Sequence, residues 1–416
     1  MPFPTQPSLL RTPDFLKLWA AHTFETLASL MGALALVAVL VLHATPQQMA
    51  LLVAAGTAPP LVAGLAVGVW VDRLRRKPLL IAADIGRAAA LASVPLAFLL
   101  GFLRIEHLYA VALVNGLLDI LFDVAHPSFV PTVVRREHMA EANAKLAGAA
   151  SVVEVGAMAV SGWTSQLASA IWATALNAGA FLLSGLLILS LRTREHRPGA
   201  QASRSVSREL VDGLSYLWRQ PVLRALAWAW LLIGLTHGFI GSMVLLFALR
   251  DLAIAPGVFG LIDGVGGLSA LVGAVVATRL TRRYGIGPVM VAMGVFGGIG
   301  ALLIPLAGGS FALSVAFLLG ANVVSNWAWA VFDINDLTLR QSLTPDDVRG
   351  RVNGAMRWLR LAATFVGALA ASVVVTWAGI RWTLALGGVA TLAATLVLAL
   401  SPVRALRSLP DQTRRA

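Results

Sequence analysis

The stretch Gly64-Leu65-Ala66-Val67-Gly68-Val69-Trp70-Val71-Asp72-Arg73-Leu74-Arg75-Arg76-Lys77-Pro78 decides the fold. It closes an uncharged apolar run, 49–71, and carries four basic residues in the five positions 73–77. A run of this length can cross a bilayer, and basic residues at its end favour the cytoplasmic side. Gly64 and Gly68 share one helical face, which lets a neighbouring helix approach, and Asp72 adds a negative charge. The stretch therefore predicts a transmembrane helix that ends in a charged cytoplasmic turn.

Composition places the chain in a membrane. Of its 416 residues 58% are hydrophobic and 12% are charged, and the mean hydropathy is +0.80. Soluble domains carry about 25% charged residues. The net charge of +12 does not indicate nucleic-acid binding, because the basic residues lie in short loops between apolar runs. Cysteine is absent, which excludes disulfides and thiolate metal sites.

Apolar runs continue along the chain and fit twelve transmembrane helices. They form an N-terminal set in 1–191, a polar linker in 192–221 and a C-terminal set in 222–416. The first run is too long for the apolar core of a signal peptide, so we interpret it as a span. The expected spans are 18–42, 49–71, 79–102, 108–130, 144–167, 168–191, 222–249, 258–280, 288–306, 311–333, 353–377 and 382–400.

The distribution of Lys and Arg orients these spans. All but three of the 32 Lys and Arg residues fall on the side that holds both termini, and the exceptions are Arg104, Arg250 and Arg381. Because positively charged loops stay in the cytoplasm, we expect both termini there.

The polar linker contains four apolar residues at helical spacing, Val206, Leu210, Leu214 and Leu217. This spacing predicts a short amphipathic helix. We expect it to lie on the cytoplasmic surface of the membrane.

The two halves repeat one another. Phe122-Asp123 and Asn143 in the first half recur 210 positions later as Phe332-Asp333 and Asn353. Such a parallel repeat predicts two similar bundles with a binding site between them.

The charged turn resembles the loop between helices 2 and 3 of the major facilitator superfamily, which reads roughly G-x-L-a-D-r-x-G-R-K. The resemblance implies an all-α membrane protein with twelve transmembrane helices in two pseudo-symmetric six-helix bundles. It also implies a cytoplasmic gate in which Asp72 faces the N-terminal end of helix 11. Arg75 stands where the family usually has glycine. The matching residues are Gly64, Gly68, Asp72, Arg73, Arg76 and Lys77.

Three further segments resemble the drug-efflux branch that includes macrolide and siderophore exporters. They are residues 15–19, 71–73 with 83–84, and 131–143. The chain departs from this branch at Ala28-Ser29, where a membrane carboxylate is usual, and at Arg135, where proline is usual. Glu25 lies one helical turn before Ser29 on the same face.

Ionisable side chains inside apolar helices are costly and are therefore candidates for function. Glu25, Asp119 and Glu154 lie at least two turns inside their predicted helices, with no Lys or Arg within four positions. A carboxyl group removed from water favours its neutral form, so it can exchange protons near pH 7. We expect at least one of the three to bind protons or substrate, and the sequence leaves open which one. Asp84 and Arg87, three residues apart, can pair on one helical face.

Asp123 and Asp333 lie toward the cytoplasmic ends of predicted helices 4 and 10. We expect Asp123 to pair with Arg76, and Asp333 with Arg282 or Arg283, which would hold the inward gate shut in an outward-open state. Direct contact with substrate is the alternative for both carboxylates.

Predicted helix 10 also carries Asn322, Asn326 and Trp327, which we expect in a cavity wall that stacks on a flat apolar or cationic compound. Asp263 is interpreted as a hydrated residue near a helix end. His22 and His237 are interpreted as interior histidines with satisfied hydrogen bonds.

These features predict a secondary transporter of the bacterial inner membrane, with both termini cytoplasmic. The expected activity is proton-coupled export of amphiphilic drugs or siderophore-like molecules by alternating access. An importer, a lipid-moving relative or a non-transporting receptor are the alternatives, because a fold does not determine direction or substrate. No nucleotide-binding glycine loop, metal-ligand cluster or nucleophile motif is present, so we expect no enzyme activity and no cofactor besides the proton gradient. The expected partners are a small-molecule substrate, protons and lipid, without nucleic acid, and the chain is expected to be a monomer.

Overall fold

The computed structural model describes residue 9 and residues 12–193, 195 and 206–407, except for the side chains at 65, 66, 68–70, 72, 73, 206–209 and 347. Every regular element in these residues is helical. The first half contains α1 (Pro13–Leu30), α2 (Ala33–Leu40), α3 (Pro46–Arg73), α4 (Arg76–Leu99), α5 (Ile105–Val133), η2 (Arg136–His138), α6 (Met139–Leu167) and α7 (Ala170–Leu189). The second half contains α8 (Val206–Arg219), α9 (Pro221–Leu246), η3 (Phe247–Asp251), α10 (Pro256–Tyr284), α11 (Ile286–Leu306), α12 (Phe311–Leu343), α13 (Asp346–Leu400) and η4 (Pro402–Ala405).

Ten segments of the described chain are long and apolar enough to cross a membrane. One of them, Val348–Leu400, has 53 residues. A straight helix of that length would extend about 80 Å, whereas the hydrocarbon core of a bilayer is about 30 Å thick. It bends at Gly379, whose φ of 77° and ψ of 174° are not helical. The expected spans 353–377 and 382–400 correspond to the two arms of α13, and the first arm begins earlier than expected, at Asp346.

The first expected span, 18–42, is two helices rather than one. α1 ends at Leu30 and α2 begins at Ala33, and Gly32 between them has a φ of +61°. Glycine adopts this left-handed conformation without the steric cost of a Cβ. Ser29, Gly32 and Ala33 at this break line the larger cavity described below.

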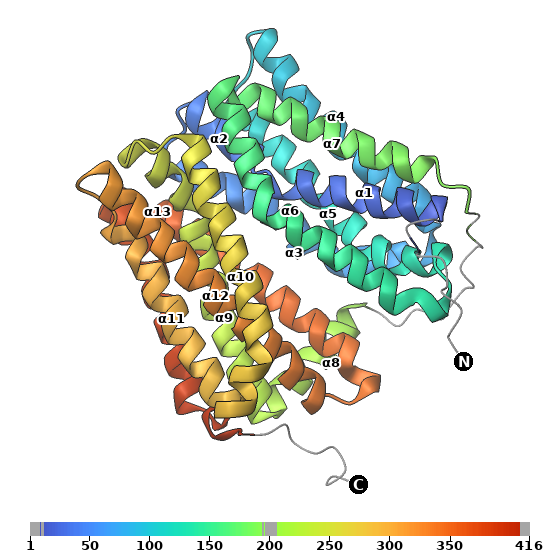
Figure 1. The fold of residues 1–416 in the computed structure, drawn as a ribbon, viewed down its shortest axis with the longest axis vertical. Coiled ribbons are helices and arrows are strands. Elements are labelled where there is room, and N and C mark those ends of the chain that lie inside the picture. The colour runs from blue at the N-terminus through green and yellow to red at the C-terminus, as the bar shows by residue number, and fades with distance from the viewer. Residues whose placement is uncertain (1–8, 10–11, 194, 196–205, 408–416) are drawn as a thin grey trace, which may run out of the picture.

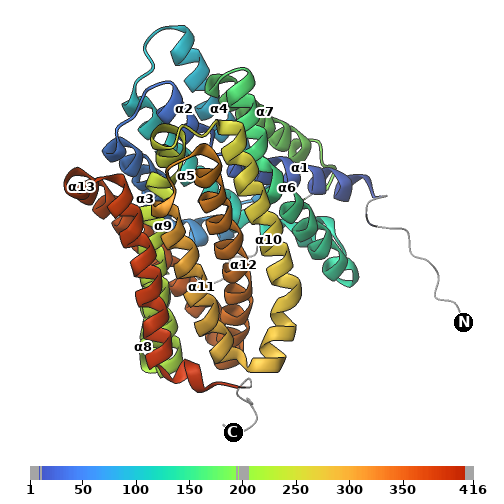
Figure 2. The same cartoon turned by 60° about the vertical axis from the view of Figure 1, so that its left-hand side comes forward.

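The helices form two bundles (Figure 1). α1–α7 pack mainly among themselves and α9–α13 do the same, while the largest contacts between the bundles join α6 to α10 and α3 to α13. A Cβ on Gly260 of α10 would lie 2.5 Å from the backbone oxygen of Met158 in α6. Glycine is needed there because the two backbones are so close. This contact involves the second half of α6 and the first half of α10, away from the chain termini (Figure 2).

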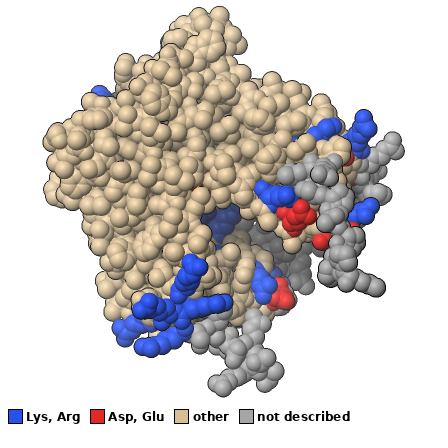
Figure 3. Space-filling view, viewed as in Figure 1, with Lys and Arg blue, Asp and Glu red and all other residues tan. Residues whose placement is uncertain are grey.

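The bundles diverge toward the lower right of Figure 1, on the side where α8 lies. The space-filling view shows a hollow between them at this end, with Lys and Arg side chains gathered around the opening (Figure 3). The structure therefore holds the bundles together at one end and apart at the other.

The predicted amphipathic helix is present as α8, but its apolar face does not lie toward lipid. Leu217 is fully buried, and Leu210 and Leu214 pack against the core of the second bundle. Asp212 of α8 pairs with Arg351 of α13 at 3.6 Å. The apolar face therefore packs on α13 and α9, and the position of α8 relative to the membrane stays a prediction.

Candidate substrate and proton site

A buried arginine forms the centre of the first bundle. Arg87 of α4 is 1% exposed, and its guanidinium donates to Glu25 of α1 at 3.0 Å, to Asp84 of α4 at 2.6 Å and to Asp119 of α5 at 3.1 Å. The predicted pairing of Asp84 with Arg87 is confirmed. Glu25 and Asp119, predicted independently as candidates, meet at the same guanidinium, and we call these four residues the Arg87 cluster.

The three carboxylates of the Arg87 cluster differ in their surroundings. Glu25 and Asp84 are buried, and each also accepts a hydrogen bond from a serine, Ser29 at 2.9 Å and Ser184 at 2.6 Å respectively. The side chain of Asp119 is 46% exposed, and among the described residues its hydrogen-bonding partner is Arg87. Asp119 is therefore the carboxylate of the cluster that a ligand can reach.

Aromatic rings hold the guanidinium of Arg87 in place. Its central carbon lies 4.2 Å from the ring centre of Phe181 and 4.9 Å from that of Phe122. Such cation–π contacts favour the charged form of arginine in an apolar setting. Phe122 stacks in turn on His126, which stacks on His22 with ring centres 4.6 Å apart. His22 Nδ1 is buried and has no hydrogen-bond partner among the described residues, so the partner expected for His22 is not found there.

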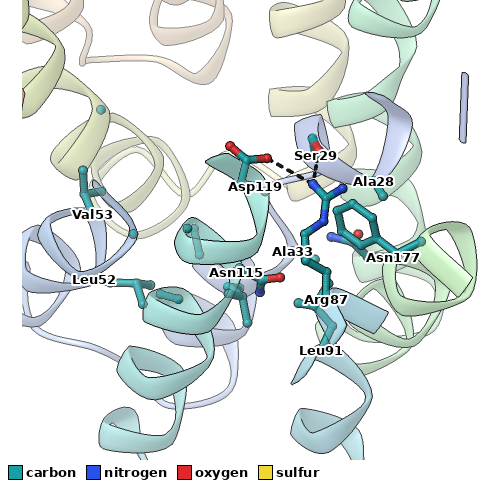
Figure 4. A pocket seen from close by; sticks show the side chains of 18 of the residues that line it. Ala28, Ser29, Ala33, Leu52, Val53, Arg87, Leu91, Asn115, Asp119 and Asn177 are labelled. Carbon is teal, nitrogen blue, oxygen red and sulfur yellow. Dashed lines mark hydrogen bonds and ion pairs between the residues drawn. The ribbon is translucent and has the colours of Figure 1, made fainter. Parts of the chain in front are cut away.

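A cavity of about 500 Å³ adjoins the Arg87 cluster (Figure 4). Its walls are mostly small and apolar, and Arg87 and Asp119 form part of its polar end. Asn115 of α5 and Asn177 of α7 also line it, and the Oδ1 atoms of both are buried without a hydrogen-bond partner in the part of the chain that the structure describes. Buried acceptors of this kind are costly unless a ligand or water satisfies them. We call this space the N-half cavity.

A second cavity of about 310 Å³ lies in the other bundle, and we call it the C-half cavity. Its lining includes Asn322 and Asn326 from α12, as expected, but Trp329 rather than Trp327. Trp327 packs against Phe296 with ring centres 5.7 Å apart. The correction follows from helix geometry, since residues two positions apart point in nearly opposite directions.

The remaining predicted carboxylate, Glu154 of α6, lies outside the Arg87 cluster. It is exposed, and it interacts electrostatically with Asp263 of α10 across the contact between the bundles. Asp263 itself lines the C-half cavity, in the first part of α10, which its interpretation as a hydrated residue near a helix end did not include. His237 of α9 lines the same cavity and has the expected hydrogen-bond partner, the carbonyl oxygen of Ile233 at 2.9 Å.

The expected gate pairs are not formed in this structure. Arg76 lies 3.6 Å from Glu195, whose carboxylate also accepts the backbone N–H groups of Arg76 and Lys77. Asp123 pairs with Arg357 of α13 at 2.6 Å, which joins the two bundles. The predicted Arg76–Asp123 pair is absent here because each residue has another partner.

The other gate residues follow the same pattern. Asp333 interacts with Arg360 and Arg340 rather than with Arg282 or Arg283. Gly64 packs against the side chain of Ile120 in α5, within its own bundle. The side chains of Gly68, Asp72 and Arg73 lie outside the described residues, so the predicted contact of Asp72 remains a prediction. These residues were predicted for a closed cytoplasmic gate, whereas the structure has the bundles apart at this end.

Several site residues were missed by sequence reasoning. Asn115 and Asn177 carry no pattern that distinguishes them from other polar residues in apolar helices. Arg340, Arg357 and Arg360 line a third cavity of about 280 Å³, with Asn353 and Trp230. The position of Arg357 and Arg360 inside the predicted span 353–377 could have indicated these two, because intramembrane arginines are as costly as intramembrane carboxylates.

This fold and these cavities define a membrane protein of two helical bundles with ionisable groups between them, as in secondary transporters. The family model described as Major Facilitator Superfamily matches residues 18–249 of this chain. The chain therefore belongs to this superfamily, and it is a member of a transporter family, not an enzyme.

Two curated relatives carry functional names. The chain is 29% identical over 350 residues to the multidrug efflux pump Tap of Mycolicibacterium fortuitum, covering 79% of this chain and 81% of Tap. It is 25% identical over 311 residues to the enterobactin exporter EntS of Shigella dysenteriae serotype 1, covering 73% of this chain and 71% of EntS.

Solved structures share the fold at low sequence identity. The nucleoside transporter NupG matches with a TM-score of 0.75 and 14% identity, over 93% of this chain and 98% of NupG. A bacterial homologue of the iron transporter ferroportin in its inward-facing state matches with a TM-score of 0.72 and 19% identity, over 94% of this chain and 99% of that chain. These likenesses concern the fold alone.

Proposed function

We propose that this protein exports amphiphilic small molecules in exchange for protons, and that the exchange takes place at the Arg87 cluster. One observation carries the proposal: a single buried guanidinium faces three carboxylates beside a cavity. With all three carboxylates ionised the cluster has an excess of two negative charges. Removing a charge from water costs several kcal/mol per ion, so a proton or a cationic group bound there relieves a large cost.

Asp119 is the group at which proton and substrate compete in this proposal. Its side chain is half exposed to the cavity, whereas Glu25 and Asp84 are buried and held by serine hydroxyls as well as by Arg87. Because a proton and a substrate cation would neutralise the same carboxylate, binding of either one favours release of the other. Glu25 and Asp84 then serve to keep Arg87 charged and in place.

We further propose that twelve helices cross the membrane, six in each bundle, with both termini in the cytoplasm. The two arms of α13 and the 28-residue helix α3 support this number. The basic residues around the open end support the orientation, since positive charge marks the cytoplasmic side. In this orientation the structure is inward-facing, and the contact between α6 and α10 closes the outer side. The proposed location is the bacterial inner membrane, and the proposed functional unit is a monomer.

The direction of transport rests on the relatives. Tap is named an efflux pump and EntS an exporter. NupG is named a nucleoside transporter, and it shares only the fold. The observations therefore favour export, with amphiphilic drugs or siderophore-like molecules as the substrate class.

The test begins with cells that contain or lack the protein, challenged with chemically diverse amphiphilic amines and catecholates. A compound to which the protein gives resistance is then added to purified protein in weakly buffered detergent, and released protons are counted. Wild type is expected to release protons on binding, and Asp119→Asn is expected to release none while still binding neutral compounds. Glu106→Gln is the matched control, because Glu106 is exposed in the first turn of α5. Equal proton release by Asp119→Asn and wild type would refute the role of Asp119.

A further inference from the structure

Both cavities share one wall residue, Gly241 of α9. Leu245, one turn further along α9, lines the N-half cavity, whereas Ile240 and Val244 line the C-half cavity. Apart from the neighbouring backbone of α9 itself, a Cβ built on Gly241 would have no heavy atom of the described residues within 4 Å. The side of α9 that separates the cavities is therefore open at this residue, where a longer side chain would project into free space.

The polar groups of the C-half cavity are mainly hydrogen-bond acceptors. His237 Nδ1 faces the carbonyl oxygen of Ile233 at 2.9 Å. Since a carbonyl can only accept, Nδ1 is the donor, and in the neutral ring Nε2 remains as an acceptor. Asn326 donates its amide N–H groups to Asn322, with a distance of 2.9 Å to the backbone oxygen, so Asn326 Oδ1 is an acceptor.

The charges around the C-half cavity also favour a ligand group that donates hydrogen bonds. Asp263 is the acidic residue in its lining, and no Lys or Arg of the described chain belongs to that lining. Glu154 adds a second negative charge close to Asp263. Two like charges destabilise each other, and a positively charged donor relieves the repulsion. Trp329 supplies an aromatic face in the same lining.

The N-half cavity has a different character. Apart from its polar end at the Arg87 cluster, Asn115 and Asn177, its walls are small and apolar. Its walls therefore suit the apolar body of a ligand, and its polar end suits a cationic group at the far end of that body. Pockets of about 300–1,000 Å³ hold drug-sized ligands, and each of the two cavities reaches the lower end of that range on its own.

We propose that the two cavities form one elongated binding site joined across Gly241, and that Gly241 sets the length of substrate that the site accepts. The substrate class is an elongated diamine: one ammonium group lies at Asp263 and His237, the apolar spacer passes Gly241, and the second ammonium group lies at Asp119 in the N-half cavity. Such a ligand contacts both bundles at once, so its binding energy depends on how the bundles are placed. The inference rests on the proposed transport function and specifies the substrate of the same site.

The experiment uses full-length protein in detergent and a homologous series of probes. In each probe two primary amines are joined by a polymethylene spacer, and spacer length increases along the series. Affinity is measured by calorimetry without a proton gradient. For wild type we expect affinity to rise with spacer length until the N-half cavity is filled, and then to stop rising.

Two substitutions separate the ends of the site. Gly241→Leu is expected to weaken the long probes by about tenfold or more and to leave the shortest probes unchanged, because only the long ones pass Gly241. Asp263→Asn is expected to weaken every probe, because it removes the charge that holds the amine. Gly179→Leu is the fold control, since Gly179 of α7 also has open space around its Cβ and lines neither cavity. Gly241→Ala provides a milder variant with a smaller effect in the same direction.

The outcomes separate this inference from the proposed function. If Gly241→Leu weakens all probes equally, or none of them, the joined site is refuted. If affinity depends on length as expected but binding of these amines releases no protons, the joined site stands and proton exchange is refuted. If Asp119 releases protons on binding but Gly241→Leu changes nothing, proton exchange stands and the joined site is refuted.

Discussion

Replacing Arg87 by methionine should unfold the first bundle unless negative charge is removed with it. Methionine keeps an unbranched apolar side chain between the rings of Phe122 and Phe181, so the change mainly removes the charge. Glu25, Asp84 and Asp119 are then left without their cation. Breaking a buried ion pair by removing one partner costs about 3–5 kcal/mol, which lowers the ratio of folded to unfolded protein by about 10² to 10⁴.

Removing the stranded negative charges, by substitution or by acidification, tests this account of the Arg87 cluster. Adding Glu25→Gln and Asp84→Asn to Arg87→Met removes the two fully buried charges, so most of the lost stability should return. Acidification should also restore stability to Arg87→Met, because protons neutralise the stranded carboxylates. The measurement is unfolding in mixed detergent and dodecyl sulfate micelles, followed by tryptophan fluorescence at several pH values. If Arg87→Met is as stable as wild type, or if its defect responds neither to pH nor to the two amide substitutions, the account of the cluster is wrong.

Three further expectations concern packing between the bundles and at the linker. Asp123→Asn removes the half-exposed ion pair with Arg357, which is worth about 0–1 kcal/mol. A cysteine introduced in the N-half cavity of this cysteine-free chain should then react a few-fold faster with a water-soluble maleimide. An unchanged reaction rate would contradict this expectation. Gly162→Val should force α6 away from the backbone of Pro256 and increase maleimide labelling of the introduced cysteine from the outer side. Gly148→Val, whose side chain meets open space, should not increase this labelling. Equal labelling in both variants would show that the contact between α6 and α10 does not close that side. Leu217→Asp should destabilise the protein by about 2–5 kcal/mol, because it buries a charge where α8 packs on the second bundle. Val211→Asp, on the exposed face of α8, should change stability little. Equal shifts in melting temperature for the two variants would contradict the packing of α8 on the bundle.

Some of the candidate site could be predicted from local sequence. Asp84 and Arg87 pair because they are three positions apart on one helix, a spacing that is visible without a structure. Glu25 and Asp119 were recognisable by the cost of placing carboxylates in apolar runs. Their meeting at one guanidinium was not, because it depends on how α1, α4 and α5 pack. The error at Trp327 has a similar origin, since the sequence shows that two tryptophans lie in one helix but not which of them turns inward.

The linker shows where a periodic pattern stops being informative. Leu210, Leu214 and Leu217 indicate that one face of α8 must leave water. They do not indicate whether lipid or protein covers that face, because both are apolar. The partners of Arg76 and Asp123 depend in the same way on conformation, since charged side chains pair with whichever opposite charge the current arrangement of the bundles brings near.

The sequence by itself determined that this chain is a helical membrane protein and a member of its superfamily, because length, apolarity and the charged turn at 64–78 are local properties of the chain. It also determined which ionisable residues are expensive in a membrane. Only the tertiary structure decided that three carboxylates share Arg87, that Asp263 and Trp329 face a cavity, and that Gly241 lies between two cavities. These facts depend on the rotation and tilt of packed helices, and the free energy that sets them comes from contacts between residues far apart in the chain.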